Sequence, residues 1–158
     1  MAVSLIKDDQ IQMRRILAGL LDRSEADGVV VCDSGGYVLA QEGRETEDPL
    51  LLSALGAGVF AASRELARIL GEDEFSAVFH QGEHKSILIR AVNREVLLVI
   101  VFSRTDRVGL VRMYAAPAAV ELRRLIDHMK ERPCDADHPE QVFVLQEEGD
   151  LFGVEKQG

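Results

Sequence analysis

The sequence predicts an α/β protein of the α+β type, with one five-stranded antiparallel sheet and helices on both faces. Two observations lead to this fold class. Segments with helical spacing of apolar residues and short apolar runs follow each other in the order helix, two strands, long helix, three strands, helix. The chain has 158 residues, of which 47% are hydrophobic, which is enough for a single core.

The first half of the chain contains a helix, a hairpin and a long helix. Apolar residues from Met13 to Leu21 have helical spacing, with Asp8 or Asp9 as the expected cap. The runs 28–32 and 37–40 are expected strands, because the glycine-rich turn between them favours a hairpin. The long helix should run over 49–70, from a cap at Asp48 to a stop at Gly71.

The second half of the chain is richer in strands. Residues 75–79 are expected to form a short helix, and strands are expected over 86–92, 96–102 and 109–114. The run 96–102 is apolar without alternation, so both of its faces should be covered. A last helix should begin at Pro117 and end before Pro133. We therefore expect one domain over 1–132 and an acidic C-terminal tail over 133–158.

The long helix has an unusual number of small residues in its first turns. Ala54, Ala57, Gly58 and Ala61 fall on one stripe, where a second backbone could approach closely. We interpret the stripe as a contact surface, and the alternative is that it packs under a loop of the same chain. The larger side chains of the helix are expected to face the sheet: Leu52, Leu55, Val59, Leu66, Ile69 and Leu70.

Charge and composition restrict the classes of partner. A net charge of −9 argues against nucleic-acid binding, which depends on cationic side chains that neutralise phosphates. The longest apolar run, over 96–102, is too short to cross a bilayer, so we expect no membrane insertion. The N-terminus lacks the pattern of a signal peptide, and the expected location is the cytoplasm.

Few residues suggest chemistry of their own. His80 and His84 could form a metal pair, and His128, Cys134 and His138 a second group, but neither spacing matches a zinc motif. No glycine-rich phosphate loop or activated nucleophile is present. We therefore predict no catalytic residues, no metal and no cofactor.

Arg104 and Arg107 share one loop and could reach a phosphate as an arginine finger does. A solvated loop between strands is the interpretation we favour for this pair.

Several stretches resemble the Roadblock/dynein light chain family, and within it the bacterial MglB-like subgroup. The most specific is LARILGEDEF over 66–75, continued by FHQG over 79–82. The beginning of the small-residue helix, LGAG over 55–58, and the pair VIVF and GLVR over 99–102 and 109–112 are also similar. The resemblance extends over residues 5–131 and implies a Roadblock-type order of elements, α-β-β-α-β-β-β-α.

The resemblance also implies a function. Members of the subgroup are homodimers whose second helices pack together and whose third strands pair, here Ser86 to Val92 with Ile87 and Ile89. Each dimer binds one small Ras-like GTPase of the MglA-like kind through the paired helices. It stimulates GTP hydrolysis without an arginine finger, with exchange as a further activity, and the output is cell polarity in motile bacteria.

By position, the GTPase-facing residues would be Ala57, Gly58, Ala61 and Glu65, with Ala54 near the dimer axis. The family has small residues where this chain has Arg64 and Glu65, which bears on the choice of partner. Ala61→Arg is predicted to abolish GTPase binding without unfolding the chain.

Two other functions remain open at this level. The chain could be a Roadblock scaffold without effect on GTP turnover, or a small-molecule sensor of the PAS or profilin-like kind. The acidic tail is either a disordered end or a segment that docks through 142–145 or Leu151 and Phe152.

Overall fold

A computed structural model describes residues 2–44, 48–133 and 142–144 of the chain. In chain order the helices and strands are β1 Ala2–Ser4, α1 Lys7–Ser24, β2 Gly28–Asp33, β3 Val38–Gly43, α2 Pro49–Leu70, β4 Ala77–Gln81, β5 Ser86–Ala91, β6 Val96–Phe102, a short 3-10 helix Thr105–Arg107, α3 Val108–Glu131 and β7 Val142–Val144.

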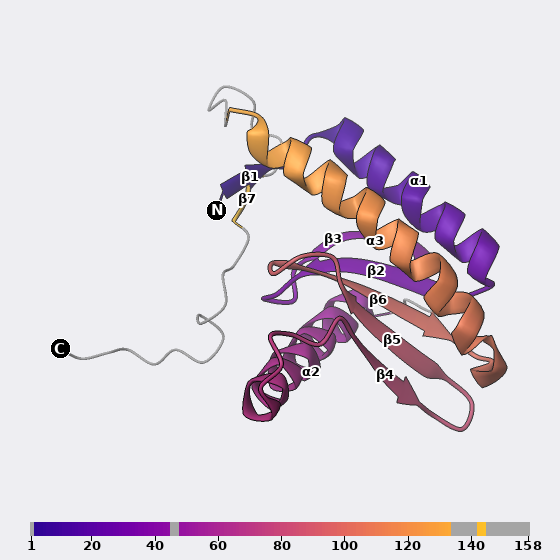
Figure 1. Ribbon diagram of the computed structural model, residues 1–158. Helices are drawn as coiled ribbons and strands as arrows, with labels where there is room; N and C mark the ends of the chain where they lie inside the picture. Colours follow the sequence, from indigo (N-terminus) through magenta and orange to yellow (C-terminus); the bar gives the residue numbers. More distant parts are fainter. Residues whose placement is uncertain (1, 45–47, 134–141, 145–158) are drawn as a thin grey trace.

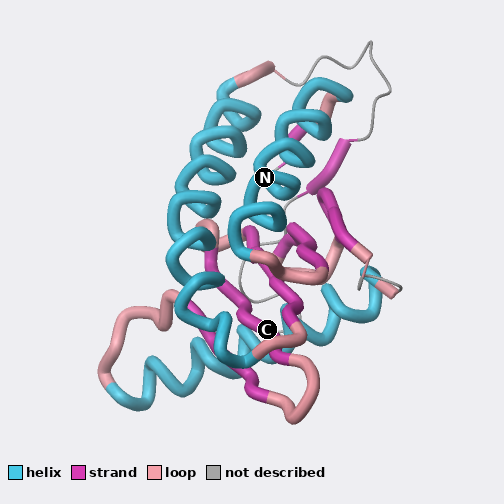
Figure 2. The backbone as a smooth tube through the Cα atoms, turned by 90° about the vertical axis from the view of Figure 1, so that its right-hand side faces the viewer, coloured by secondary structure: helices cyan, strands magenta, loops and turns pink. Residues whose placement is uncertain are grey.

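Three layers make up the fold (Figure 1). The helices α1 and α3 lie side by side on one face of the sheet, and α2 alone crosses the opposite face (Figure 2). The central sheet has five antiparallel strands in the order β3-β2-β6-β5-β4. The predicted fold class and the order of elements are confirmed.

Two of the expected elements are wrong, although the number of strands in the central sheet is right. Residues 77–81 form the edge strand β4 instead of a short helix. Ala77 and Phe79 pack toward α1 and α3 while Val78 packs toward α2, which is the two-residue period of a strand. The helix-like spacing of the two phenylalanines concealed this alternation.

Residues 109–114 belong to α3, which begins at Val108 and passes through Pro117. Val111, Ala115 and Leu122 are buried at helical spacing, so burial of this face favours a helix over a strand. A proline in a helix removes the hydrogen bond to the carbonyl four residues earlier. Here that carbonyl belongs to Met113, and Met113 and Pro117 are both exposed, so the bond is lost on the solvent side of the helix.

The strands β2 and β6 form the centre of the core. Every residue of both strands is buried, as expected for β6 from its unbroken apolar sequence. Alternate side chains point to opposite faces: Val29 and Val31 toward α1 and α3, and Val30 and Cys32 toward α2. The sheet therefore has two separate hydrophobic cores, one under each helix layer.

The beginning of α1 and the end of α3 are joined by an ion pair. Arg132 at the end of α3 donates to Asp9, whose carboxylate also accepts from the backbone N–H of Ile6 at 3.0 Å. Beyond this junction, β1 and β7 pair as a separate two-stranded sheet. Beyond Pro133 only β7 is described, so Leu145, Leu151 and Phe152 lie outside the described residues, as do Cys134 and His138.

Candidate functional site

The helix α2 is the candidate site, and both of its ends are as predicted. Asp48 caps it by accepting from the backbone N–H of Leu51 at 3.0 Å, and Pro49 takes the first helical position. Gly71 ends it with a φ of 75°, a left-handed conformation that glycine adopts at little cost. The helix is thus a full 22 residues long and lies across the sheet (Figure 1).

The face of α2 that touches the sheet is made of small side chains with one exception. Gly56 and Ala57 lie directly on the strands, since a Cβ on Gly56 would be 3.4 Å from a methyl carbon of Val99. Phe60 is the only large side chain among the buried residues of this helix: Ser53, Gly56, Ala57, Phe60, Ser63 and Ala67. A close helix–sheet approach follows from this pattern.

The larger side chains of α2 face solvent within the single chain. Leu55 is 61% exposed, Leu66 56%, Ile69 72% and Leu70 70%. The expectation that these four residues face the sheet is therefore wrong, because the small residues take that place. Leu52 and Val59 are half-buried at the margin of the core, as expected.

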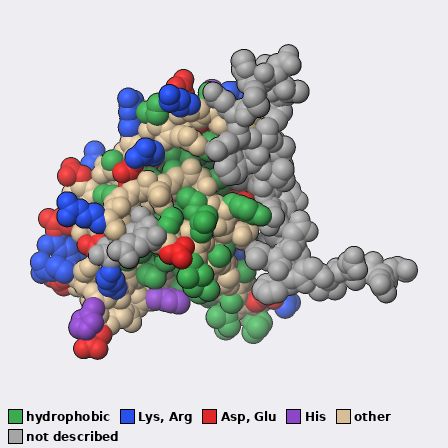
Figure 3. All heavy atoms as spheres, turned by 180° about the vertical axis from the view of Figure 1, so that it is seen from behind, with side chains coloured by type: hydrophobic (Ala, Val, Ile, Leu, Met, Phe, Trp, Pro, Cys, Tyr) green, Lys and Arg blue, Asp and Glu red, His purple; other side chains and the backbone are tan. Residues whose placement is uncertain are grey.

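An outer stripe with helical spacing runs along α2: Leu51, Leu55, Gly58, Ala62, Leu66 and Ile69. Its two ends carry large apolar side chains, and its middle carries only Gly58 and Ala62. Hydrophobic side chains gather low on the molecule in the view from behind, over the region of α2 (Figure 3). By length and composition alone α2 is apolar enough to cross a membrane, and 33% of that span is buried within the single chain.

The predicted contact residues of α2 fall in three different environments. Ala57 is 2% exposed and belongs to the core under α2. Gly58 and Ala61 are half-buried, while Glu65 is exposed and paired with Arg68 at 3.0 Å. Ala54 is exposed beside the β2–β3 turn, where a Cβ on Gly36 would lie 2.7 Å from the Cα of Ala54. Their roles in binding stay predictions.

Residues 86–92 were expected to be the strand that pairs across a dimer, and the structure does not fit this assignment. Residues 86–91 form β5, which is hydrogen-bonded to β4 on one side and β6 on the other, so it has no free edge. Ile89 is 3% exposed and Ile87 is half-buried, both on the α2 side of the sheet. The third strand of the sheet in chain order is β4, and β4 has a free edge.

Arg64 does not project from the outer stripe. Its guanidinium donates to the backbone carbonyl of Arg94 at 2.9 Å, lies 3.2 Å from the carboxylate of Glu74 and is stacked over the ring of Phe60. Its side chain is only 11% exposed. Arg64 thus fixes α2 to the β5–β6 turn and to the segment before β4, a role that no pattern in the sequence indicates.

Two titratable groups lie near the start of α2. Burial raises the pKa of the Cys32 thiol to about 12, so this cysteine is an inert core residue. Burial also raises the pKa of Asp33, while its hydrogen bonds from the backbone N–H groups of Tyr37 and Gly35 oppose the shift. Asp33 therefore supports the β2–β3 turn and Cys32 belongs to the core under α2, and neither suggests catalysis.

The other candidate chemical groups do not assemble into a site. His80 and His84 are exposed, and among the described residues no group of three potential ligands could hold a metal ion. Arg104 is paired with Asp106 at 2.8 Å and Arg107 with Glu25, so both arginines are engaged within the chain. Their segment forms a 3-10 helix that leads into α3.

Comparison with known proteins agrees with this architecture. Residues 14–102 match the Roadblock/LC7 domain. The gliding protein MglB of Thermus thermophilus is 28% identical, with a TM-score of 0.74 over 80% of this chain and 96% of that one. Myxococcus xanthus MglB is 30% identical, with a TM-score of 0.70 over 74% and 96%.

A third solved structure, MglB with a tetrameric arrangement, is 27% identical and has a TM-score of 0.76 over 80% of this chain and 96% of that one. The matched domain covers more than half of the chain, and the structural similarity covers a larger share of it than the domain does. The chain therefore belongs to the Roadblock/LC7 domain family and to its MglB-like subgroup.

Proposed function

We propose that this chain is a cytoplasmic, homodimeric regulator of a small Ras-like GTPase in bacterial motility and polarity. The outer stripe of α2 is the observation that supports this most directly. A soluble protein seldom leaves several large apolar side chains more than half exposed along one helix unless another protein covers them. Membership of the MglB-like subgroup supports a GTPase as the regulated partner.

In this proposal the outer stripe forms the dimer, and the flank of α2 beside it binds the GTPase. Gly58 and Ala62 at its middle allow the α2 helices of two copies to cross closely, because neither carries bulk. The large apolar residues on either side of the crossing then bury one another. The flank that carries Ala61 and Glu65 stays accessible beside the crossing for the GTPase.

Arg64 bears on the choice between a regulator and an inert scaffold. Its charge is turned into the chain, so it does not obstruct a GTPase at this surface. Glu65 is the other charged residue at a position where the family has a small one. Its ion pair with Arg68 is exposed and weak. A regulator is therefore the function that the surface supports better.

The test is single-turnover GTP hydrolysis by an MglA-like GTPase from the same organism, with and without excess regulator. We expect faster hydrolysis with the wild-type chain and with Val120→Asp, which adds a charge to the far side of the molecule. Ile69→Asp should abolish both the dimer, measured by sedimentation, and the acceleration. GTPase binding without faster GTP hydrolysis would indicate a scaffold. Faster hydrolysis with a monomeric Ile69→Asp variant would contradict the proposal that the dimer is the active form.

A further inference from the structure

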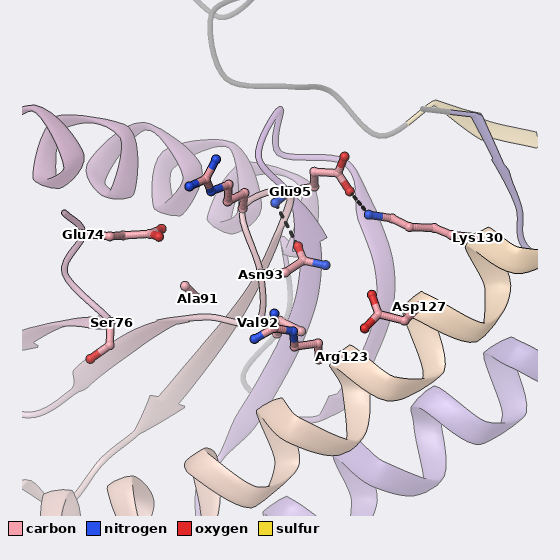
Figure 4. A pocket seen from close by; sticks show the side chains of 10 residues that line it. Glu74, Ser76, Ala91, Val92, Asn93, Glu95, Arg123, Asp127 and Lys130 are labelled. Atoms are coloured by element: carbon pink, nitrogen blue, oxygen red, sulfur yellow. Dashed lines mark hydrogen bonds and ion pairs between the residues drawn. The ribbon is translucent and has the colours of Figure 1, made fainter.

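A polar cleft lies between the C-terminal half of α3 and the turn that joins β5 to β6 (Figure 4). Its volume is about 810 Å³, and the buried residue Val92 is among those that line it. None of its lining residues belongs to α2. The cleft is thus separate from the surface of α2 to which we assign partner binding.

The side-chain amide of Asn93 in this cleft has a fixed orientation. Its Oδ1 accepts from the backbone N–H groups of Glu95 and Val96, both at 2.8 Å. Because only the oxygen can accept these two bonds, the other atom must be Nδ2. Nδ2 has no hydrogen-bond partner among the described residues, and it points toward the α3 side of the cleft (Figure 4). The cleft therefore contains a preoriented donor that the fold does not use.

Some charges of the cleft are neutralised within the chain. Lys130 on α3 is paired with Glu95 in the turn (Figure 4). Glu74, on the opposite side, is paired with Arg64. The first pair joins the two walls of the cleft, and both pairs leave little charge of their own for a ligand.

Three further charges of the cleft lack an ion-pair partner in the described part of the chain: Arg94, Arg123 and Asp127. Arg123 and Asp127 are one turn apart on α3 and project toward the turn beside Asn93, without pairing with each other (Figure 4). The unneutralised charge of the cleft is therefore two positive and one negative.

We propose that this cleft binds an acidic amino acid, a small molecule with two carboxylates and one ammonium group. The carboxylates complement Arg94 and Arg123, and the amide of Asn93 donates to one of them. The ammonium group complements Asp127. A ligand with a net charge of −1 matches the net charge of +1, and no simple dicarboxylate or monocarboxylate satisfies all three residues. Since the cleft is open to water, a dissociation constant on the order of 1 mM is expected.

The direct test is titration of the full chain with L-glutamate and L-aspartate, followed by NMR of its side-chain amides and by calorimetry. At least one of them should bind saturably and shift the Asn93 side-chain amide signal. Glutarate lacks the ammonium group and γ-aminobutyrate lacks one carboxylate, so both should bind at least 10-fold more weakly. No saturable binding of either amino acid at tens of millimolar would overturn the proposal.

Substitutions of the charged residues test which of them bind the ligand. Arg123→Gln should weaken binding at least 10-fold, whereas Arg124→Gln, on the adjacent exposed residue that does not line the cleft, should leave it unchanged. Asp127→Asn should remove the preference for glutamate over glutarate. Thermal melting shows whether each variant is folded. Equal binding by the two arginine variants, or an unchanged preference in Asp127→Asn, would mean that the cleft is not the site.

Discussion

The two faces of the central sheet are covered in opposite ways. On one face, α1 and α3 turn large side chains such as Leu17, Leu122 and Ile126 inward, and the resulting core is complete within one chain. On the other face, α2 turns small residues inward and large ones outward. The first face therefore stabilises the single chain, while the second leaves apolar surface exposed.

The difference between the faces separates the residues that serve folding from those expected to serve binding. Burial on the α1 and α3 side follows from the usual requirement that apolar surface leaves water. Exposure of the outer stripe of α2 opposes that requirement, and the proposed partner would remove this surface from water. Changes on the inner face of α2 should thus affect folding, and changes on its outer face should affect assembly.

The largest effect is expected from Phe60→Ala, which removes the one large side chain of α2 that is fully buried in the core under it. The cavity and the lost burial should lower the free energy of unfolding by about 3–5 kcal/mol. Urea denaturation measures this loss. Leu55→Ala is the matched control on the outer face, and at concentrations where the chain is monomeric it should cost less than about 0.5 kcal/mol. Similar costs for the two variants would contradict the contrast between the faces.

A smaller effect is expected from Arg64→Ala, which releases α2 from the β5–β6 turn. The guanidinium has a charged hydrogen bond, a carboxylate partner and an aromatic ring, so its loss should cost about 1–3 kcal/mol. Arg68→Ala removes an arginine that is 75% exposed and paired one turn away with Glu65. Such a pair contributes about 0.5 kcal/mol or less. Denaturation of both variants should separate them clearly, and an Arg64→Ala as mild as Arg68→Ala would show that the tether is not formed.

Local sequence signals predicted the features that depend on neighbouring residues in the chain. The Asp48 cap, the Gly71 stop and the β2–β3 turn depend on residues within one or two turns, and all three are confirmed. The burial of both faces of β6 was also readable, because its apolar run has no polar interruption.

Elements and contacts that depend on distant residues could not be predicted. The strand β4 is identified by its alternation between two cores, which exist only once the sheet has formed. Which face of α2 meets the sheet depends on how closely the strands allow it to approach. The position of Arg64 depends on the carbonyl of Arg94, which lies 30 residues further along the chain. None of these partners can be located by spacing along the chain.

The smallest effect is expected from Gly58→Ala, which should change monomer stability and dimer affinity in opposite directions. A Cβ on Gly58 would have no neighbour within 4 Å in the single chain, so Gly58→Ala should stabilise the monomer by about 0.5–1 kcal/mol through helix propensity. At the proposed crossing of two α2 helices, the same methyl group should separate the helices and weaken the dimer. Gly56→Ala on the inner face is the control, since its Cβ would lie 3.4 Å from Val99, in contact with the sheet and away from the proposed crossing.

Denaturation of the monomer and sedimentation of the dimer measure the two consequences of Gly58→Ala separately. A more stable monomer together with a weaker dimer would place the helix crossing at Gly58, because only a close second backbone makes the added methyl group unfavourable. If the variant strengthened both, the middle of the outer stripe would not be a close contact. The crossing would then have to lie nearer Leu66 and Ile69, where the exposed apolar surface is larger.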